Sequence, residues 1–159
     1  MYLLTDAAID IACPGAEAFE FACDLENFAT WFPGVIDVVT HNAVPFSERG
    51  REYRETVQVP LRGRRLVPIR VVDADAPRWL ATEGDLSIVM PRMEIRIAES
   101  SPHQCTVHWR MFSRNTGLLT RLLVLPLART VMTKRATAGL RRLKQRLEHD
   151  HCDNRPESV

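Results

Sequence analysis

The chain has 159 residues, of which 45% are hydrophobic and 26% charged, and its formal net charge is +1. This composition is typical of one globular domain with a sizeable core, and the total charge gives no sign of a nucleic-acid partner. No stretch approaches the roughly 18 apolar residues of a membrane span. The start lacks the basic region of a secretory signal, and the cysteines show neither Cys-x-x-Cys nor disulfide-framework spacing. We therefore expect a cytoplasmic protein with free thiols.

The first part of the chain predicts one strand followed by two short helices. Residues 4–12 alternate apolar and polar side chains, and residues 15–23 follow a Pro–Gly break and carry one apolar helical face. A second helix is predicted over residues 25–32, where Pro33-Gly34 ends it. It presents three large rings on one side: Phe28, Trp31 and Phe32. On the sequence alone, such rings are expected to plug the core.

From Val35 onward the apolar pattern changes to a period of two, which is typical of strands. The predicted strands cover residues 35–43, 51–60, 64–74, 78–84, 92–100 and 104–113. Proline, glycine, aspartate and serine occupy the breaks between them, as turns require. A series of short strands without intervening helices indicates an antiparallel meander.

The last periodic stretch, residues 117–148, predicts one long amphipathic helix. Its apolar stripe consists of Leu118, Leu122, Leu125, Met132, Ala136, Leu140, Leu143 and Leu147. Pro126 interrupts the pattern, so we expect a kink or a fresh start there. Residues 1–148 are thus predicted to form one domain, and residues 149–159 a polar, flexible tail.

This order of elements resembles the START-like or helix-grip superfamily, also called SRPBCC, and its polyketide cyclase/dehydrase and lipid-transport branch in particular. The strings that carry the resemblance are IACPGAEAFEFACDLENFATWFPGV (11–35), RGREYRE (49–55), VVDADAPRWLA (71–81) and the closing TGLLTRLLVLPLARTVMTKRATAGLRRLKQRLE (116–148). The resemblance implies an α+β fold in which a curved antiparallel sheet of about seven strands wraps around the C-terminal helix. It also implies a hydrophobic cavity between sheet and helix, closed at one end by the short helices, with no metal or other cofactor.

Strand alternation predicts which side chains face the helix and so line that cavity. The predicted ligand-binding residues are Phe28, Trp31, Phe32, Val57, Val59, Val67, Ile69, Met93, Ile95, Ile97, Val107, Trp109, Met111 and, on the helix, Met132. Soft methionine and apolar side chains on a concave wall suit a hydrophobic ligand. The alternative is a fully packed core, which is commoner for such faces.

Glu55 is the one carboxylate predicted to point inward from a strand, with Tyr53 two residues away on the same face. A carboxyl in an apolar pocket has a raised pKa and can act as an acid or base near neutral pH. Glu55 and Tyr53 are therefore the candidate catalytic residues of a cyclase or dehydratase. The alternatives are a one-residue error in register or an ion pair at the rim, with Arg51 as the expected partner.

Charge is unevenly distributed, because no Lys or Arg precedes Arg49 and no Asp or Glu lies between Glu99 and Glu148. The basic helix is expected to be a solvated face, or else to contact an anionic membrane through Arg121, Arg129, Lys134, Arg135, Arg141 and Arg142. Nucleic acid is not expected, since no aromatic residues alternate with these charges. His41 is expected to be an ordinary surface residue, and the histidines near Cys152 match no structural zinc site.

Three functions remain open from the sequence. The first is binding or transport of a hydrophobic small molecule such as a lipid, a polyketide-like aromatic or an isoprenoid. The second is a polyketide cyclase/dehydratase-type enzyme that uses Glu55 and Tyr53. The third is an interaction module that docks on a membrane or protein through the basic helix. Neither the ligand nor the oligomeric state follows from the sequence.

Overall fold

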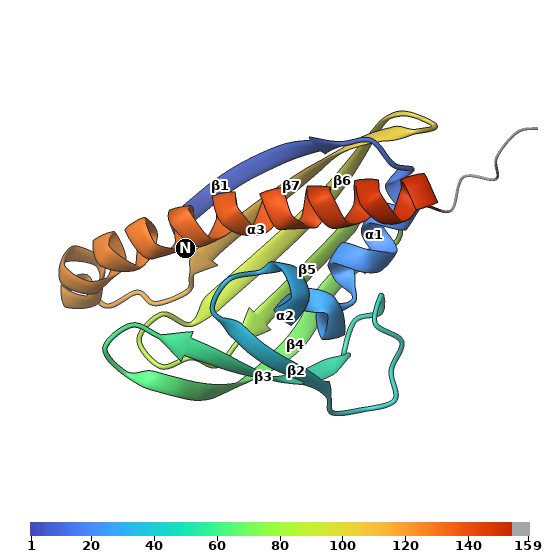
Figure 1. The fold of residues 1–159 in the computed structure, drawn as a ribbon. Coiled ribbons are helices and arrows are strands. Elements are labelled where there is room, and N and C mark those ends of the chain that lie inside the picture. The colour runs from blue at the N-terminus through green and yellow to red at the C-terminus, as the bar shows by residue number, and fades with distance from the viewer. Residues whose placement is uncertain (154–159) are drawn as a thin grey trace, which may run out of the picture.

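Figure 1 shows one curved antiparallel sheet with a long helix lying across it, which confirms the helix-grip fold. The computed structural model describes residues 1–153. The strands are β1 (Tyr2–Ile11), β2 (Val35–Thr40), β3 (Glu52–Val59), β4 (Gly63–Asp75), β5 (Trp79–Gly84), β6 (Pro91–Ser101) and β7 (Gln104–Ser113). They pair in the order β1-β7-β6-β5-β4-β3-β2. Strands β2 to β7 thus form the expected meander, and β1 adds to its far edge.

The connection from β1 to β2 crosses from one edge of the sheet to the other through short helices. It contains α1 (Gly15–Cys23), the 3₁₀ turn η1 (Leu25–Asn27) and α2 (Phe28–Trp31). The expectation of one helix over residues 25–32 is wrong in this respect. The Asp24 carboxylate accepts a hydrogen bond from the backbone N–H of Glu26 (3.1 Å), which caps the tight first turn separately.

The C-terminal helix α3 (Leu125–Asp153) follows the π-helical turn η2 (Thr120–Val124). Pro126 has no N–H, and its ring would clash with the carbonyl of Leu122 in a regular α-helix. A wider turn before Pro126 avoids this clash. In it the Leu125 N–H donates a hydrogen bond to the carbonyl of Thr120, five residues earlier. The expected kink is therefore a π-turn directly before Pro126.

The apolar stripe of the last helix is shorter at its start than the sequence predicted. Leu118 and Leu122 are exposed, so the buried stripe begins at Leu125. At its other end the helix continues to Asp153, so residues 149–153 are helical and the predicted tail does not begin there. Residues 154–159 of that tail lie outside the described residues. No helix within residues 1–153 combines the length and apolarity that crossing a bilayer requires.

Helix α3 covers only part of the concave face. It packs along β1 and also contacts α2 and β7, whereas its backbone makes few close approaches to β3 and β4. Near its C-terminal end, Lys144 Nζ donates to the Asp10 carbonyl (2.6 Å), and the Glu148 carboxylate accepts from the Ala12 N–H (2.9 Å). The helix is therefore fixed to the β1 edge and leaves the β3–β4 half of the face less covered.

Aromatic rings fill the junction between the short helices, the sheet and α3. The Phe28 and Phe32 rings stack at 4.9 Å between centroids, and the Trp31 ring meets Phe28 edge-on at 4.7 Å. Phe32 also contacts Trp109 of β7 at 4.9 Å. Gly139 permits this approach on α3, since a Cβ there would lie 3.0 Å from a Phe32 ring carbon. The rings are buried and pack on one another, as a plug does.

Because Trp109 is fully buried against Phe32, we expect Trp109→Ala to lower the free energy of unfolding by about 3–5 kcal/mol. Trp79→Ala is the matched control. Trp79 is half-buried on the outer face, where Arg96 lies over its ring, so its loss should cost clearly less. Urea unfolding followed by circular dichroism measures both, and equal costs would contradict the packing described for Trp109.

Candidate functional site

The concave wall has a closed half and a more open half. Cross-strand register places Leu80, Ile95, Trp109 and Ala7 in one row across the sheet. The predicted wall residues Val67, Met93, Ile95, Ile97, Val107 and Trp109 are all buried. The other predicted wall residues are only partly buried: Val57, Val59, Ile69, Met111 and Met132. The partly buried apolar side chains therefore include Val57, Val59 and Ile69 of β3 and β4, strands to which the backbone of α3 makes few close approaches.

Glu55 lies on β3 at the border between these two halves. It pairs across the sheet with Val38 and Val67, and only 8% of the residue is exposed. Its carboxylate forms neither an ion pair nor a hydrogen bond with any residue described here. Burial raises the pKa of Glu55 from the ordinary 4.5 to about 7, and the positive charge of Arg135 opposes this rise.

Arg135 of α3 supplies that charge from the opposite wall. Its Nη2 donates to the Gln58 carbonyl (2.7 Å), so the guanidinium spans from α3 to β3. It lies against Gly34, where a Cβ would stand 2.4 Å from Cζ of Arg135 and where φ is +92°. The sequence places Arg135 on a basic face that is either solvated or in contact with a membrane, whereas in the structure its guanidinium bonds to the sheet.

Arg51, the expected partner of Glu55, bonds elsewhere. Its guanidinium donates to the carbonyls of Asn42 and Val44 and to the hydroxyl of Thr40. These bonds hold the irregular segment between β2 and β3 and place the guanidinium over the Tyr53 ring, 5.1 Å from its centroid. The alternative of an ion pair between Arg51 and Glu55 is therefore not seen in the described structure.

Tyr53 is buried beside this segment, and burial raises its pKa to about 12, an effect that Arg51 partly opposes. Its hydroxyl donates no hydrogen bond to any of residues 1–153, although the Arg51 guanidinium approaches it, and neither Nε1 of Trp31 nor Nε1 of Trp109 has a partner among these residues. Buried donors without partners are uncommon and costly. The two indoles lie inside the packed rings, whereas the Tyr53 hydroxyl is on the same face of β3 as Glu55 and can donate to an oxygen of a bound molecule. The pKa of Tyr53 is influenced by the charges of Arg51, Asp24 and Glu26, whereas the pKa of Glu55 is influenced by the charge of Arg135. The two candidate residues therefore have different electrostatic surroundings.

Two hollows mark the outer face of the sheet. One, of about 580 Å³, is lined mostly by charged side chains, including those of Glu52, Arg54, Arg70, Glu83 and Arg114, and His41 is at its rim. The other, of about 340 Å³, lies among Trp79, Glu94, Arg96, His108 and Arg110. Walls of this charge do not suit an apolar ligand. His41 is exposed, as expected.

The pairing of Arg135 with Gly34 is not predicted by the sequence pattern. Arg135 stands three residues after Met132 and four before Gly139, which places it on the flank of the buried stripe. That spacing was the available signal, although a helix with many basic residues offers several such positions. The sequence predicts for Gly34 only that it ends a helix. Its other role is to leave room for the guanidinium of Arg135, a residue about a hundred positions away in the chain.

A family model for polyketide cyclase/dehydrase and lipid transport matches residues 4–148. The solution structure of a Thermobifida fusca protein superposes with a TM-score of 0.67 at 17% identity, covering 91% of this chain and 92% of that chain. The Zhui aromatase/cyclase from Streptomyces sp. R1128 gives a TM-score of 0.68 at 17% identity, with the same coverage. The di-domain ARO/CYC StfQ of the steffimycin biosynthetic pathway gives 0.69 at 10% identity, and this chain covers 53% of it. No curated protein matches the sequence. At these identities the superpositions show the shared fold.

We expect Gly34→Ala to be destabilising for two separable reasons. The positive φ costs about 1–3 kcal/mol for a residue with a Cβ, and the clash with the Arg135 guanidinium adds to it. In an Arg135→Ala background the clash disappears and only the backbone cost remains. Gly50→Ala is the control, since φ is +95° there and nothing lies within 4 Å of its Cβ position. A double-mutant cycle by urea unfolding should show coupling for Gly34 and none for Gly50. Equal coupling at both sites would mean that Arg135 does not lie over Gly34.

We also expect Glu55 to make stability fall as pH rises from about 4.5 to about 7. In this window the unfolded chain has released the proton of Glu55 while the folded protein still holds it. Glu55→Gln should thus leave stability unchanged below pH 4.5 and raise it above pH 7, by on the order of 3 kcal/mol. Glu20→Gln, an exposed change on α1, is the control. Urea unfolding at several pH values checks this, and a difference that does not vary with pH would contradict it.

Proposed function

Since the chain belongs to the polyketide cyclase/dehydrase and lipid-transport family, we propose that it binds a hydrophobic small molecule on the concave face of its sheet. The molecule lies between α3 and the β3–β4 half, against Val57, Val59 and Met132. The observation that carries this proposal is the partial exposure of these apolar side chains on an inner face. In a fully packed core they would be as inaccessible as Val107 and Trp109 are.

The polar groups near this surface indicate which polar atoms the ligand carries. Glu55 holds a proton up to about neutral pH and can donate it to a ligand oxygen, while Arg135 places a positive charge nearby. The Tyr53 hydroxyl, two positions away on the same face of β3, is a further hydrogen-bond donor for a ligand oxygen. We therefore propose a largely apolar ligand that carries oxygen atoms, such as a polyketide-like aromatic or an oxygenated lipid. A purely hydrocarbon ligand would leave these donors unpartnered.

The enzymatic alternative rests on the pKa of Glu55. A carboxyl that titrates near pH 7 can take a proton from a carbon beside a carbonyl and return it to a departing hydroxyl, which is the chemistry of cyclisation and dehydration. The Tyr53 hydroxyl, with a pKa of about 12, stays protonated and could only hold a carbonyl oxygen in place. The solved structures of similar fold include aromatase/cyclases, which is why this alternative is kept.

A cytoplasmic location is part of the same proposal. It is supported by Cys13, Cys23 and Cys105, which are free thiols buried in the core. A protein of this kind would meet its ligand inside the cell.

Titration with the apolar fluorophore phenylnaphthylamine tests the binding surface. We expect a bright, saturable signal with the native protein. Val57→Asp should weaken binding by at least about tenfold, because the ligand would then bury an unpaired charge. Val39→Asp is the control, since Val39 is 52% exposed on the neighbouring β2 strand, and it should leave affinity unchanged. Equal affinity of the native protein and the Val57→Asp variant would place the bound probe elsewhere.

The Glu55→Gln variant distinguishes a binding protein from an enzyme. Turnover of an aromatic polyketide analogue by the native protein, lost in Glu55→Gln while phenylnaphthylamine still binds, would establish the enzyme. Binding of that analogue without conversion by either protein would establish the binding module. Mass spectrometry under native conditions would reveal a ligand that copurifies in either case.

A further inference from the structure

Leucines gather on the surface where the C-terminal helical segment begins. The exposed fractions are 71% for Leu118, 74% for Leu119, 64% for Leu122, 73% for Leu123 and 60% for Leu127. We call these five residues the leucine ridge. Such a concentration of large apolar side chains on a surface is rare in monomeric soluble proteins and marks an interaction site.

The ridge is held in place by the folded domain. Leu125, within the same segment, is fully buried, and the Arg121 guanidinium lies 5.9 Å from the centroid of the Tyr2 ring. The π-turn and the N–H bond of Leu125 to Thr120 keep the helical path continuous up to Pro126. The segment therefore presents the ridge to solvent while its inner side is anchored to the domain.

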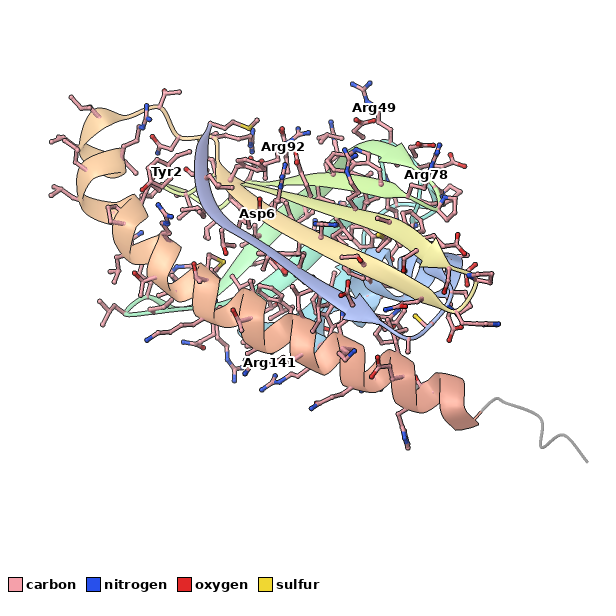
Figure 2. All side chains as sticks on the ribbon, turned by 90° about the horizontal axis from the view of Figure 1, so that it is seen from above. Tyr2, Asp6, Arg49, Arg78, Arg92 and Arg141 are labelled. Carbon is pink, nitrogen blue, oxygen red and sulfur yellow. The ribbon has the colours of Figure 1, made fainter. Side chains whose placement is uncertain are left out.

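A second apolar side chain lies at the same end of the molecule. Leu61, in the turn between β3 and β4, is fully exposed, with φ of 62° beside Gly63 at 70°. Both views place this turn and the start of the C-terminal helical segment at the same end (Figures 1 and 2). Exposed arginines lie close to these leucines in the chain, namely Arg62, Arg64, Arg65, Arg121 and Arg129. No acidic residue occurs in residues 56–72 or in residues 100–147.

We propose that this end of the protein docks on an anionic lipid bilayer. The leucine ridge and Leu61 enter the interface between headgroups and acyl chains, and the surrounding arginines contact anionic headgroups. Apolar side chains flanked by basic ones, with no acid between them, are the features of interfacial membrane binding. A second copy of the chain is a poor occupant, because symmetric contact would bring the same arginines together.

The spread of the ridge also favours lipid. Its members are spaced by one, three and four residues, so they cover a broad arc of the helix rather than the narrow stripe that a protein groove receives. The second element, at Leu61, inserts at the same end. A fluid lipid interface can accommodate both the leucine ridge and Leu61, because it does not need a surface complementary in shape to them.

The geometry changes which basic residues would contact lipid. The sequence left contact along the helix open as an alternative to a solvated face. The Arg135 side chain bonds to the sheet, whereas Arg121 is exposed beside the leucine ridge, over the Tyr2 ring. Figure 2 shows Arg141 on the side of α3 away from the sheet. Contact is therefore made by the end of the molecule. The proposed ligand surface opens toward the same half, through Val57, Val59 and Met132, and this consequence alone depends on the proposed function.

Flotation with vesicles tests the docking surface. We expect the protein to bind vesicles of phosphatidylcholine with phosphatidylglycerol, to bind pure phosphatidylcholine far less, and to release at high salt. Leu122→Ser with Leu123→Ser should weaken binding by at least about tenfold, since two buried leucines are lost. Arg62→Gln with Arg65→Gln should weaken binding to the anionic vesicles. Arg141→Gln is the matched charge control and should bind as the native protein does.

Three results would overturn the proposal. The first is that the native protein binds neither kind of vesicle. The second is that the double leucine variant binds anionic vesicles as tightly as the native protein does. The third is that the native protein is a dimer in solution while the double leucine variant is a monomer. The last would show that a second copy covers the ridge. Val57→Asp separates this proposal from the ligand surface, because it should float like the native protein while it loses phenylnaphthylamine.

Discussion

Arg135 connects the long helix to the far half of the sheet, and several other features depend on this connection. Its hydrogen bond to the Gln58 carbonyl crosses a region where the backbones of α3 and β3 make few close approaches. The guanidinium needs a residue without a side chain beneath it, and Gly34 meets that need. The same charge is the cation that acts on Glu55. One long side chain thus spans a space that apolar packing does not fill.

The two ends of the concave face differ in how they are stabilised. At the β1 side, apolar packing of Leu140, Leu143 and Leu147 is reinforced by the bonds of Lys144 and Glu148 to the end of β1. At the junction with the short helices, stacked rings exclude water from Trp109. Toward β3, the Glu55 carboxylate, which has no bonded partner among residues 1–153, shares a face of the strand with the half-buried Val57 and Val59. Such a combination is poor for a core and suitable for a ligand.

The sequence predicted the strands and helices well where the pattern was long and regular. The alternation of β7 placed Val107 and Trp109 correctly on the inner face, and the helical face of residues 15–23 matched α1. Local rules decide these features, because strand alternation and turn residues act over a few positions.

The errors share a physical cause, which is that tertiary contacts decided the outcome. Leu118 and Leu122 continued the apolar spacing, but the sheet does not extend beneath them, so they are exposed. Arg135 looked like one of several solvated basic residues, and only the fold brings it to Gln58. Strand alternation correctly predicted that Glu55 points inward. It could not predict that Arg51 would bond to the backbone carbonyls of the β2–β3 segment and so lie away from Glu55.

The protonation of Glu55 is the most direct measure of the site, because it senses burial, the charge of Arg135 and a bound ligand together. Carbon-13 NMR of the Glu55 carboxyl can follow its titration in the native protein, with and without phenylnaphthylamine. The account predicts a pKa of about 7 in the free protein, a higher value when the probe excludes water, and a higher value in Arg135→Gln. A midpoint near the ordinary 4.5 that does not respond to the probe would contradict it.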